Sequence, residues 1–154
     1  MRRWAFTVLF CIFTFALSQL ADADISDLRQ KAEEGDAQAQ ADLGLAYHDG
    51  NGVTKDYHEA YKWYRKSAEQ GLAVGERRLG TLYCQGLGVR KDPVNGVWWL
   101  QKAVAQGDLE AENNLAVCYL HGDGAERDPS LAYKLFLNAA MHGIWQAQGN
   151  LADV

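Results

Sequence analysis

Serine chemistry of the penicillin-binding kind requires a lysine three residues after the nucleophile, because that amine activates the hydroxyl. No serine in the chain is followed by a lysine at this spacing. The residues found three positions after Ser26, Ser67 and Ser130 are Arg29, Gln70 and Tyr133. The sequence therefore lacks the activating amine for this kind of acyl transfer.

Zinc hydrolysis is a second candidate, because a helix with two histidines four residues apart and an intervening glutamate can hold and use zinc. His58 and Glu59 begin such a motif, but Lys62 occupies the place of the second histidine. The Gly-x-Gly elements have no third glycine and recur three times, so we interpret them as turns and not as phosphate-binding loops. We expect no enzyme activity, no metal site and no cofactor.

A repeat of 36 residues sets the elements that position the remaining polar side chains. Gly35, Gly71, Gly107 and Gly143 recur at that spacing. Four, eight and twelve residues after each of the first three come a small residue, a leucine and a tyrosine, which share one face of a helix that we call helix A. The three triplets are Ala39, Leu43 and Tyr47; Gly75, Leu79 and Tyr83; and Ala111, Leu115 and Tyr119.

A second helix, helix B, follows each Gly-x-Gly. Glycine reaches positive φ without strain, so these elements end helix A. Asp56, Asp92 and Asp128 then provide N-caps, and Pro93 and Pro129 stand at the first helical position. Stacked helical hairpins of this kind predict an all-α fold, a right-handed α/α superhelical solenoid of helix-turn-helix repeats.

The repeated pattern Ala-x-x-x-Leu-Gly-x-x-Tyr, Gly-x-Gly-Val, Asp, then Trp and Ala-Ala resembles the Sel-one-like repeat, a relative of the tetratricopeptide repeat (TPR). The resemblance covers residues 35–154, with departures at Ala125 and at Leu135 and Phe136 in the third copy. It implies a TPR-like solenoid that serves as an adaptor in complex assembly, envelope processes or contact between a bacterium and its host.

The N-terminal segment has the layout of a secretory signal peptide. Arg2 and Arg3 precede an apolar run over residues 4–17, and Ala21 and Ala23 occupy the −3 and −1 positions of a cleavage site. The run is short for a membrane span. We expect cleavage after Ala23 and a periplasmic or secreted protein that does not associate with the membrane afterwards.

The repeat and the signal together predict the domain organisation. It comprises a signal peptide (1–23), an N-terminal capping helix (24–34), three repeats (35–70, 71–106 and 107–142) and a partial fourth repeat with helix A only (143–154). In the last unit Ile144, Ala147 and Leu151 continue the apolar stripe. Either the chain is a fragment of a longer array, which we favour, or this uncovered face is a docking surface.

Charge excludes one class of partner. The net charge is −5, and no basic run is longer than two residues. Nucleic-acid binding requires a positively charged patch, so we expect no nucleic-acid partner. We expect a protein or peptide partner and a monomeric state.

Cys84 and Cys118 lie outside the signal segment, and in an oxidising compartment such a pair favours a disulfide. Cys84 follows its repeat's tyrosine by one residue, whereas Cys118 precedes its tyrosine by one. The side chains then differ by about 200° in direction on their helices, and helix axes lie roughly 8–10 Å apart. We interpret this register as evidence against an intrachain disulfide.

We predict an exported protein–protein interaction scaffold. It would bind a protein or peptide in a concave groove lined by helix A. Resemblance to TPR proteins implies three sets of groove-facing residues. They are Gln38, Ala41, Leu45, His48 and Asp49; Val74, Arg77, Thr81, Cys84 and Gln85; and Glu110, Asn113, Val117, Leu120 and His121. The rival interpretation is a cell-wall-associated enzyme or a peptidoglycan-binding accessory protein.

Three of the candidate partner-binding residues stand out. Arg77 and Asn113 are the strongest, because an arginine beside an amide can hold a carboxylate or a peptide backbone. Trp98 occupies a helix B position held by Lys62 and Lys134 in the other copies, so it should face outward, where a tryptophan can anchor an interface.

Overall fold

The computed structural model describes residues 25–153, and within them every regular element is a helix. The predicted signal peptide, 1–23, lies outside this range. The first helical segment spans residues 25–33. It is followed by α2 (Ala37–Asp49), α3 (Tyr57–Glu69), α4 (Ala73–Gln85), α5 (Pro93–Ala105), α6 (Leu109–His121), α7 (Pro129–Met141), α8 (Trp145–Asn150) and the 3₁₀ helix η1 (Leu151–Asp153).

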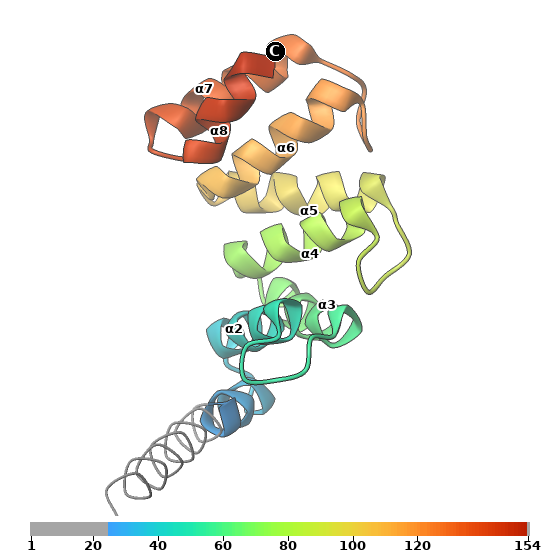
Figure 1. Cartoon of the computed structure of the whole chain (residues 1–154), viewed down its shortest axis with the longest axis vertical. Coiled ribbons are helices and arrows are strands. Elements are labelled where there is room, and N and C mark those ends of the chain that lie inside the picture. The colour runs from blue at the N-terminus through green and yellow to red at the C-terminus, as the bar shows by residue number, and fades with distance from the viewer. Residues whose placement is uncertain (1–24, 154) are drawn as a thin grey trace, which may run out of the picture.

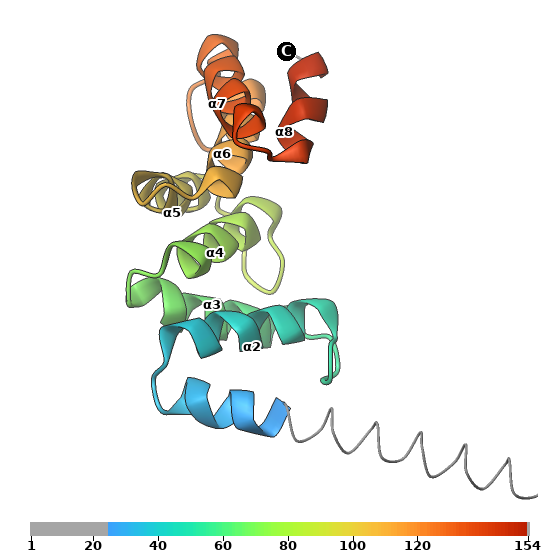
Figure 2. The ribbon, with the colours of Figure 1, turned by 90° about the vertical axis from the view of Figure 1, so that its left-hand side faces the viewer.

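The helices form antiparallel hairpins, α2 with α3, α4 with α5 and α6 with α7, which stack along one axis (Figure 1). In the view turned by 90°, segment 25–33 and α8 occupy opposite ends of the described stack (Figure 2). Other helix pairs in contact, such as α3 with α4, α5 with α6 and α7 with α8, are neighbours along this stack. The prediction of an all-α solenoid of helix-turn-helix units is confirmed.

The starts of the B helices follow from their N-caps, as predicted. The Asp56 carboxylate accepts hydrogen bonds from the backbone N–H groups of His58 and Glu59. Asp92 and Asp128 accept from Asn95 and Leu131, and a proline opens each of those helices. Each aspartate thereby satisfies an amide that has no partner within its helix.

Helix A ends at the first glycine of each Gly-x-Gly. Gly50, Gly86 and Gly122 adopt left-handed conformations, with φ of 81°, 74° and 79°, and their N–H groups bond back to the helix. The second glycine has another role: a methyl group on Gly88 or Gly124 would overlap the backbone carbonyl of Tyr57 or Pro93 in the preceding repeat. These loops therefore also contribute to stacking.

The core is a series of small apolar clusters between successive hairpins. The helix A leucines Leu43, Leu79 and Leu115 are at most 4% exposed, and the large side chains of Leu100 and Phe136 on the B helices are equally hidden. Because each cluster uses residues of adjacent hairpins, no hairpin buries its apolar face alone.

The last helix is shorter than its counterparts. α8 has six residues and continues as η1, whereas α2, α4 and α6 each have thirteen. Ala147 is buried against α7, and Ile144 and Leu151 pack beside it, so the predicted apolar stripe is used. Beyond this contact large apolar side chains stay exposed on α7 and α8: Tyr133, Leu137, Met141 and Trp145.

Candidate protein-binding groove

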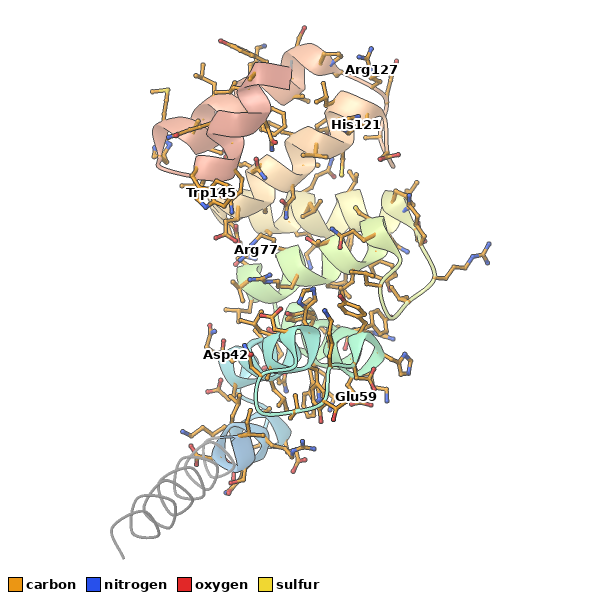
Figure 3. The ribbon with its side chains drawn as sticks, in the orientation of Figure 1. Asp42, Glu59, Arg77, His121, Arg127 and Trp145 are labelled. Carbon is orange, nitrogen blue, oxygen red and sulfur yellow. The ribbon has the colours of Figure 1, made fainter. Side chains whose placement is uncertain are left out.

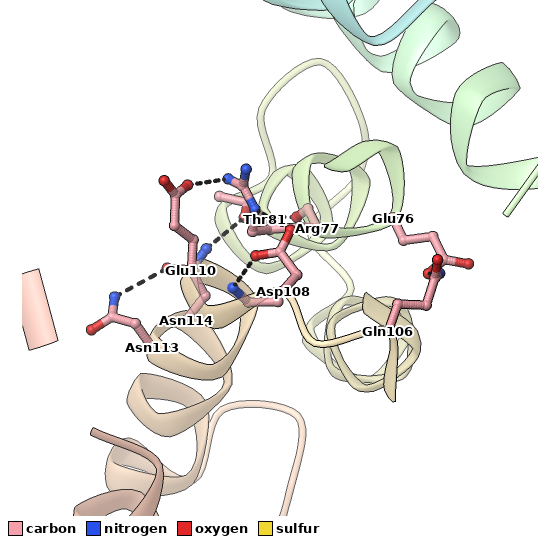
Figure 4. Close-up of polar contacts among 9 residues, drawn as sticks. Glu76, Arg77, Thr81, Gln106, Asp108, Glu110, Asn113 and Asn114 are labelled. Atoms are coloured by element: carbon pink, nitrogen blue, oxygen red, sulfur yellow. Dashed lines mark hydrogen bonds and ion pairs between the residues drawn. The ribbon is translucent and has the colours of Figure 1, made fainter. Parts of the chain in front are cut away.

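The predicted groove positions of α2, α4 and α6 define the helix A surface, and Arg77 is its most tightly held member. Arg77 Nε lies 2.9 Å from Asp108 Oδ2, and Nη1 lies 2.7 Å from Glu110 Oε2 (Figure 4). The residue is only 7% exposed. Its guanidinium ties the second repeat to the start of the third, and the partner contact that the sequence predicted for it stays a prediction.

A chain of hydrogen bonds extends from Arg77 across the A helices. The Thr81 hydroxyl donates to the Arg77 carbonyl, and Asn114 Nδ2 donates to Thr81 Oγ1 at 3.2 Å. Asn113 Nδ2 donates to Asn114 Oδ1, and Asn150 Nδ2 of α8 donates to Asn113 Oδ1 at 2.9 Å. Asn113 is buried, so like Arg77 it serves the packing of neighbouring repeats and offers little surface to a partner.

Sequence reasoning did not identify Asp108 and Asn114 as members of this network. Asp108 is the N-cap of α6 and accepts from the Ala111 N–H group as well as from Arg77. Asn114 and Asn150 stand 36 residues apart, so the repeat period itself carried a signal for the amide chain.

The other predicted positions are dispersed along the surface. Ala41 is buried in the core, whereas Gln38, Gln85 and Glu110 are exposed. Gln38 bonds to Asp42 on its own helix, and His48 Nδ1 lies 2.6 Å from Asp49 Oδ1. The structure therefore does not bring the α2 positions together with those of α6 in one site.

A cavity of about 500 Å³ lies where α6, α7 and α8 meet. Its apolar lining comes from Val117, Leu120 and Phe136, and its polar lining from His121, Arg127 and Asn150. Val117, Leu120 and His121 were predicted groove positions. Figure 3 shows His121 and Arg127 at the same end of α6. Arg127, Phe136 and Asn150 were not predicted, because they come from the following loop and from two further helices.

Among the described residues, the cavity lining carries positive charge and no carboxylate. Arg127 Nε donates to the Leu120 carbonyl at 2.9 Å, which holds the guanidinium at the rim. Within residues 25–153 Arg127 has no ion-pair partner, in contrast to Arg77. An apolar floor beside an uncompensated guanidinium suits an apolar side chain that is followed by a carboxylate.

Trp98 faces outward on α5, as its register predicted, and is 50% exposed. Its ring packs edge-on against Trp99 at 4.6 Å between centroids. Lys102 Nζ lies over both rings and 2.9 Å from the buried carboxylate of Glu76. In Figure 4 Glu76 and Gln106 lie away from the Arg77 group.

The positions of Cys84 and Cys118 contradict the prediction, made from their register, that the two side chains point apart. Cys84 Sγ and Cys118 Sγ are 3.9 Å apart, as free thiols, between α4 and α6. The error has a simple cause. When like-oriented helices stack, the face of one helix that looks forward meets the face of the next that looks back, so side chains about 200° apart in register point toward each other.

Metal binding and membrane insertion are two further properties to consider for the described residues. No group of three or more histidine, cysteine, aspartate or glutamate side chains in residues 25–153 is arranged to hold a metal ion. No helix in the same range combines the length and the apolar character that crossing a membrane requires.

Comparison with known proteins places the repeats in a wider group. Two solved structures resemble the chain closely, at 37% identity each. One is c5321, a protective antigen of uropathogenic Escherichia coli with an SLR fold (TM-score 0.75, 84% of this chain and 28% of that one). The other is a Sel1 repeat protein of Oxalobacter formigenes (TM-score 0.74, 86% and 55%). Helicobacter pylori cysteine-rich protein B shares the fold at 22% identity (TM-score 0.66, 84% and 96%).

Among curated proteins, the secretory immunoglobulin A-binding protein EsiB of Escherichia coli O6:H1 (strain CFT073) is 43% identical over 51 residues. The match spans 33% of this chain and 10% of EsiB, so the chain corresponds to a small part of that relative. The family model named Sel1 repeat matches residues 37–72, 73–108 and 109–144, each starting two residues after the repeat boundaries predicted from the glycines. Proteins built from these repeats typically serve protein–protein interaction, and the chain belongs to the Sel1 repeat family.

Proposed function

We propose that the chain is an exported, non-enzymatic scaffold that binds a segment of another protein on the helix A surface. The segment would place an apolar side chain in the cavity between α6, α7 and α8 and a carboxylate on Arg127. The observation that carries this proposal is the guanidinium of Arg127, which has no ion-pair partner among residues 25–153, beside the apolar walls Leu120 and Phe136.

Charge complementarity supports a carboxylate as the anchoring group. A guanidinium binds a carboxylate through two parallel hydrogen bonds, and within residues 25–153 only Nε of Arg127 is engaged, with the Leu120 carbonyl. Arg77 binds carboxylates inside the chain through single contacts, from Nε to Asp108 and from Nη1 to Glu110. The same chemistry at Arg127 lacks its acidic partner among residues 25–153, so a ligand is the natural source.

Exposed polar residues of α4 and α6 would extend the contact. His121 and Glu110 stand at opposite ends of α6, and Gln85 ends α4, so an extended segment along α6 would meet hydrogen-bonding groups at both ends. The amides of Asn113 and Asn114 lie between them but are already bonded to each other. We expect these two amides to shape the surface and to contribute little to binding the partner segment.

The relatives provide a first candidate partner. EsiB is named for binding secretory immunoglobulin A, and its aligned portion is 51 residues long. Because this is a tenth of EsiB, the same partner for this chain is a hypothesis to test directly. Export follows from the predicted signal peptide, and we propose a monomer.

Selection from a library of displayed peptides tests the proposal. We expect the full chain to enrich peptides in which an apolar residue precedes Asp, Glu or the free C-terminus. Arg127→Glu should weaken binding of an enriched peptide about 10-fold or more, the loss expected for a charged hydrogen-bond pair. Calorimetric titration measures the dissociation constant, and circular dichroism confirms that each variant is folded.

Lys91→Glu is the matched control, because Lys91 stands 36 residues before Arg127 and undergoes the same change of charge. It should alter binding less than about twofold, since Lys91 is not among the residues that line the cavity. Equal losses in both variants would mean that net charge, and not the cavity, drives binding. Secretory immunoglobulin A, labelled penicillin and muropeptides are titrated in parallel. If labelled penicillin or muropeptides bind, and if they bind the Arg127→Glu variant equally well, a cell-wall function would be favoured instead.

A further inference from the structure

The structure assigns Cys84 and Cys118 as a site of reversible oxidation, at which a disulfide links the second repeat to the third. Their sulfur atoms lie 3.9 Å apart on neighbouring A helices. A disulfide bond is about 2.05 Å long, so side-chain rotation with a small approach of α4 and α6 would join them. This proposal is independent of the binding function.

The surroundings of the two thiols differ, and this difference sets the order of reaction. Cys118 is buried within the core cluster that also contains Val97 and Leu115, at 5% exposure. Cys84 packs at the edge of that cluster and is only partly buried. An oxidant from solution can therefore reach Cys84 first, and Cys118 is placed to resolve the product.

Gly96 makes room for the outer thiol. A methyl group on Gly96 would collide with Cys84 Sγ. The corresponding position is Ala60 in the first repeat and Ala132 in the third, where His48 and Leu120 replace the cysteine. The glycine thus occurs in the one copy in which a sulfur atom occupies the space beside it.

The electronic character of the pair agrees with that order. The hydrogen bond from Cys118 lowers the pKa of the Cys84 thiol, because it stabilises the thiolate. The same pairing and burial raise the pKa of Cys118. The thiolate is the reactive form, so Cys84 is the attacking sulfur.

The oxidant is a low-molecular-weight disulfide such as oxidised glutathione. The Cys84 thiolate attacks one sulfur of glutathione disulfide, which releases one glutathione thiolate and leaves a mixed disulfide on Cys84. Cys118 then gives up its proton and attacks Cys84 Sγ, which releases the second glutathione. Two electrons pass from the two cysteines to the oxidant, and excess dithiol reverses the reaction.

The test uses the full chain with Cys11→Ser, so that Cys84 and Cys118 are the only thiols. We expect oxidised glutathione to remove both thiols, to lower the intact mass by about 2 Da and to leave no glutathione bound. After trypsin digestion without reduction, peptides 79–90 and 103–127 should appear as one linked species. Closing a loop of 34 residues should also raise the melting temperature by roughly 5–10 °C.

Cys118→Ser and Cys84→Ser in the same background are the controls, and circular dichroism verifies their fold. Cys118→Ser should retain one glutathione on Cys84, because nothing is present to displace it. Cys84→Ser should react more slowly, since its remaining thiol is buried. Retention of glutathione by the two-cysteine protein, linkage between two molecules, or two thiols that persist in excess oxidant would each overturn the proposal.

Discussion

Tyr61 and Tyr133 occupy the same position of the 36-residue repeat, yet their environments differ. Tyr61 lies between the first and second repeats, where its hydroxyl is 3.0 Å from that of Tyr83 and the two rings meet edge-on at 5.8 Å. Tyr133 lies on α7 and is 47% exposed. Because α8 and η1 together are shorter than the other A helices, no described residue occupies the place of Tyr83 beside it.

The next turn of the B helices shows the same contrast. Gln101 of the second repeat donates to the Tyr119 hydroxyl of the following helix A, whereas its counterpart Leu137 is 39% exposed. Equivalent repeat positions are therefore in contact with a neighbour at the junctions between repeats but exposed at α7. In a solenoid the energetic value of a residue depends on the neighbouring unit as much as on its own.

Truncation of an apolar side chain should show the largest difference between the two regions. Leu100→Ala, at a position 1% exposed between α4, α5 and α6, should lower the free energy of unfolding by about 3 kcal/mol, because it leaves a cavity. Leu137→Ala on the exposed face of α7 should cost less than about 1 kcal/mol. Urea unfolding followed by circular dichroism measures both, and equal losses would abolish the contrast.

Removal of the inter-repeat ion pair should have the next largest effect. Arg77→Ala leaves the largely buried carboxylate of Asp108 without its guanidinium, and we expect a loss of about 2 kcal/mol. Arg90→Ala, at an exposed arginine in the loop after α4, is the control and should change stability by less than about 0.5 kcal/mol. A stable Arg77→Ala variant would show that packing alone holds this junction.

Alkaline pH should weaken the first junction through Tyr64. Burial raises the pKa of Tyr64 to about 12, from 10.0 in the unfolded chain. The folded state therefore holds this proton more tightly, and its stability should decrease as pH rises from about 10 to 12, by about 2 kcal/mol. Chemical unfolding at a series of pH values measures the slope.

Tyr64→Phe introduces the residue found at the corresponding position 136, and it should flatten that slope. At neutral pH the variant should differ from the parent by less than about 1 kcal/mol, because the buried Tyr64 hydroxyl has no partner within residues 25–153. The pKa of Tyr83 is also raised to about 12, by burial first and then by its hydrogen bond with Tyr61, so part of the alkaline loss should remain. An unchanged slope would contradict the assignment to Tyr64.

The smallest effect on stability is expected at Tyr61 and Tyr133. Tyr61→Phe should lose about 0.5–1 kcal/mol, because it removes one hydroxyl–hydroxyl bond at a partly buried site. Tyr133→Phe should be neutral within error, since water already solvates that hydroxyl. Thermal unfolding of both variants is a direct comparison, and a loss at Tyr133 would indicate a contact absent from residues 25–153.

Local signals in the sequence were sufficient for the helices. Asp92 followed by Pro93 starts α5 at the expected residue, and Gly86 ends α4 in the left-handed conformation. These outcomes depend on the caps of a single helix, which act over a few residues. For the same reason Asp36 and Asp108, which cap α2 and α6, could have been found from the sequence as well.

The candidate site was predicted only in part. Val117, Leu120 and His121 do line one cavity, but Arg127 and Phe136 reach it from the following loop and from α7. For Arg77 the sequence did not indicate the burial. Its groove position was inferred from register along one helix, whereas its burial results from acidic residues of the next repeat.

The sequence by itself determined the helices, their ends, the repeat and the family, because these follow from periodicity and from caps that act within one unit. Only the tertiary structure decided which polar groups are used up between repeats and which stay available. It paired Arg77 with Asp108, left Arg127 beside a cavity and brought Cys84 to 3.9 Å from Cys118. The physical reason is that stacking turns the forward face of one helix toward the backward face of the next, and a register counted within one repeat does not contain that relation.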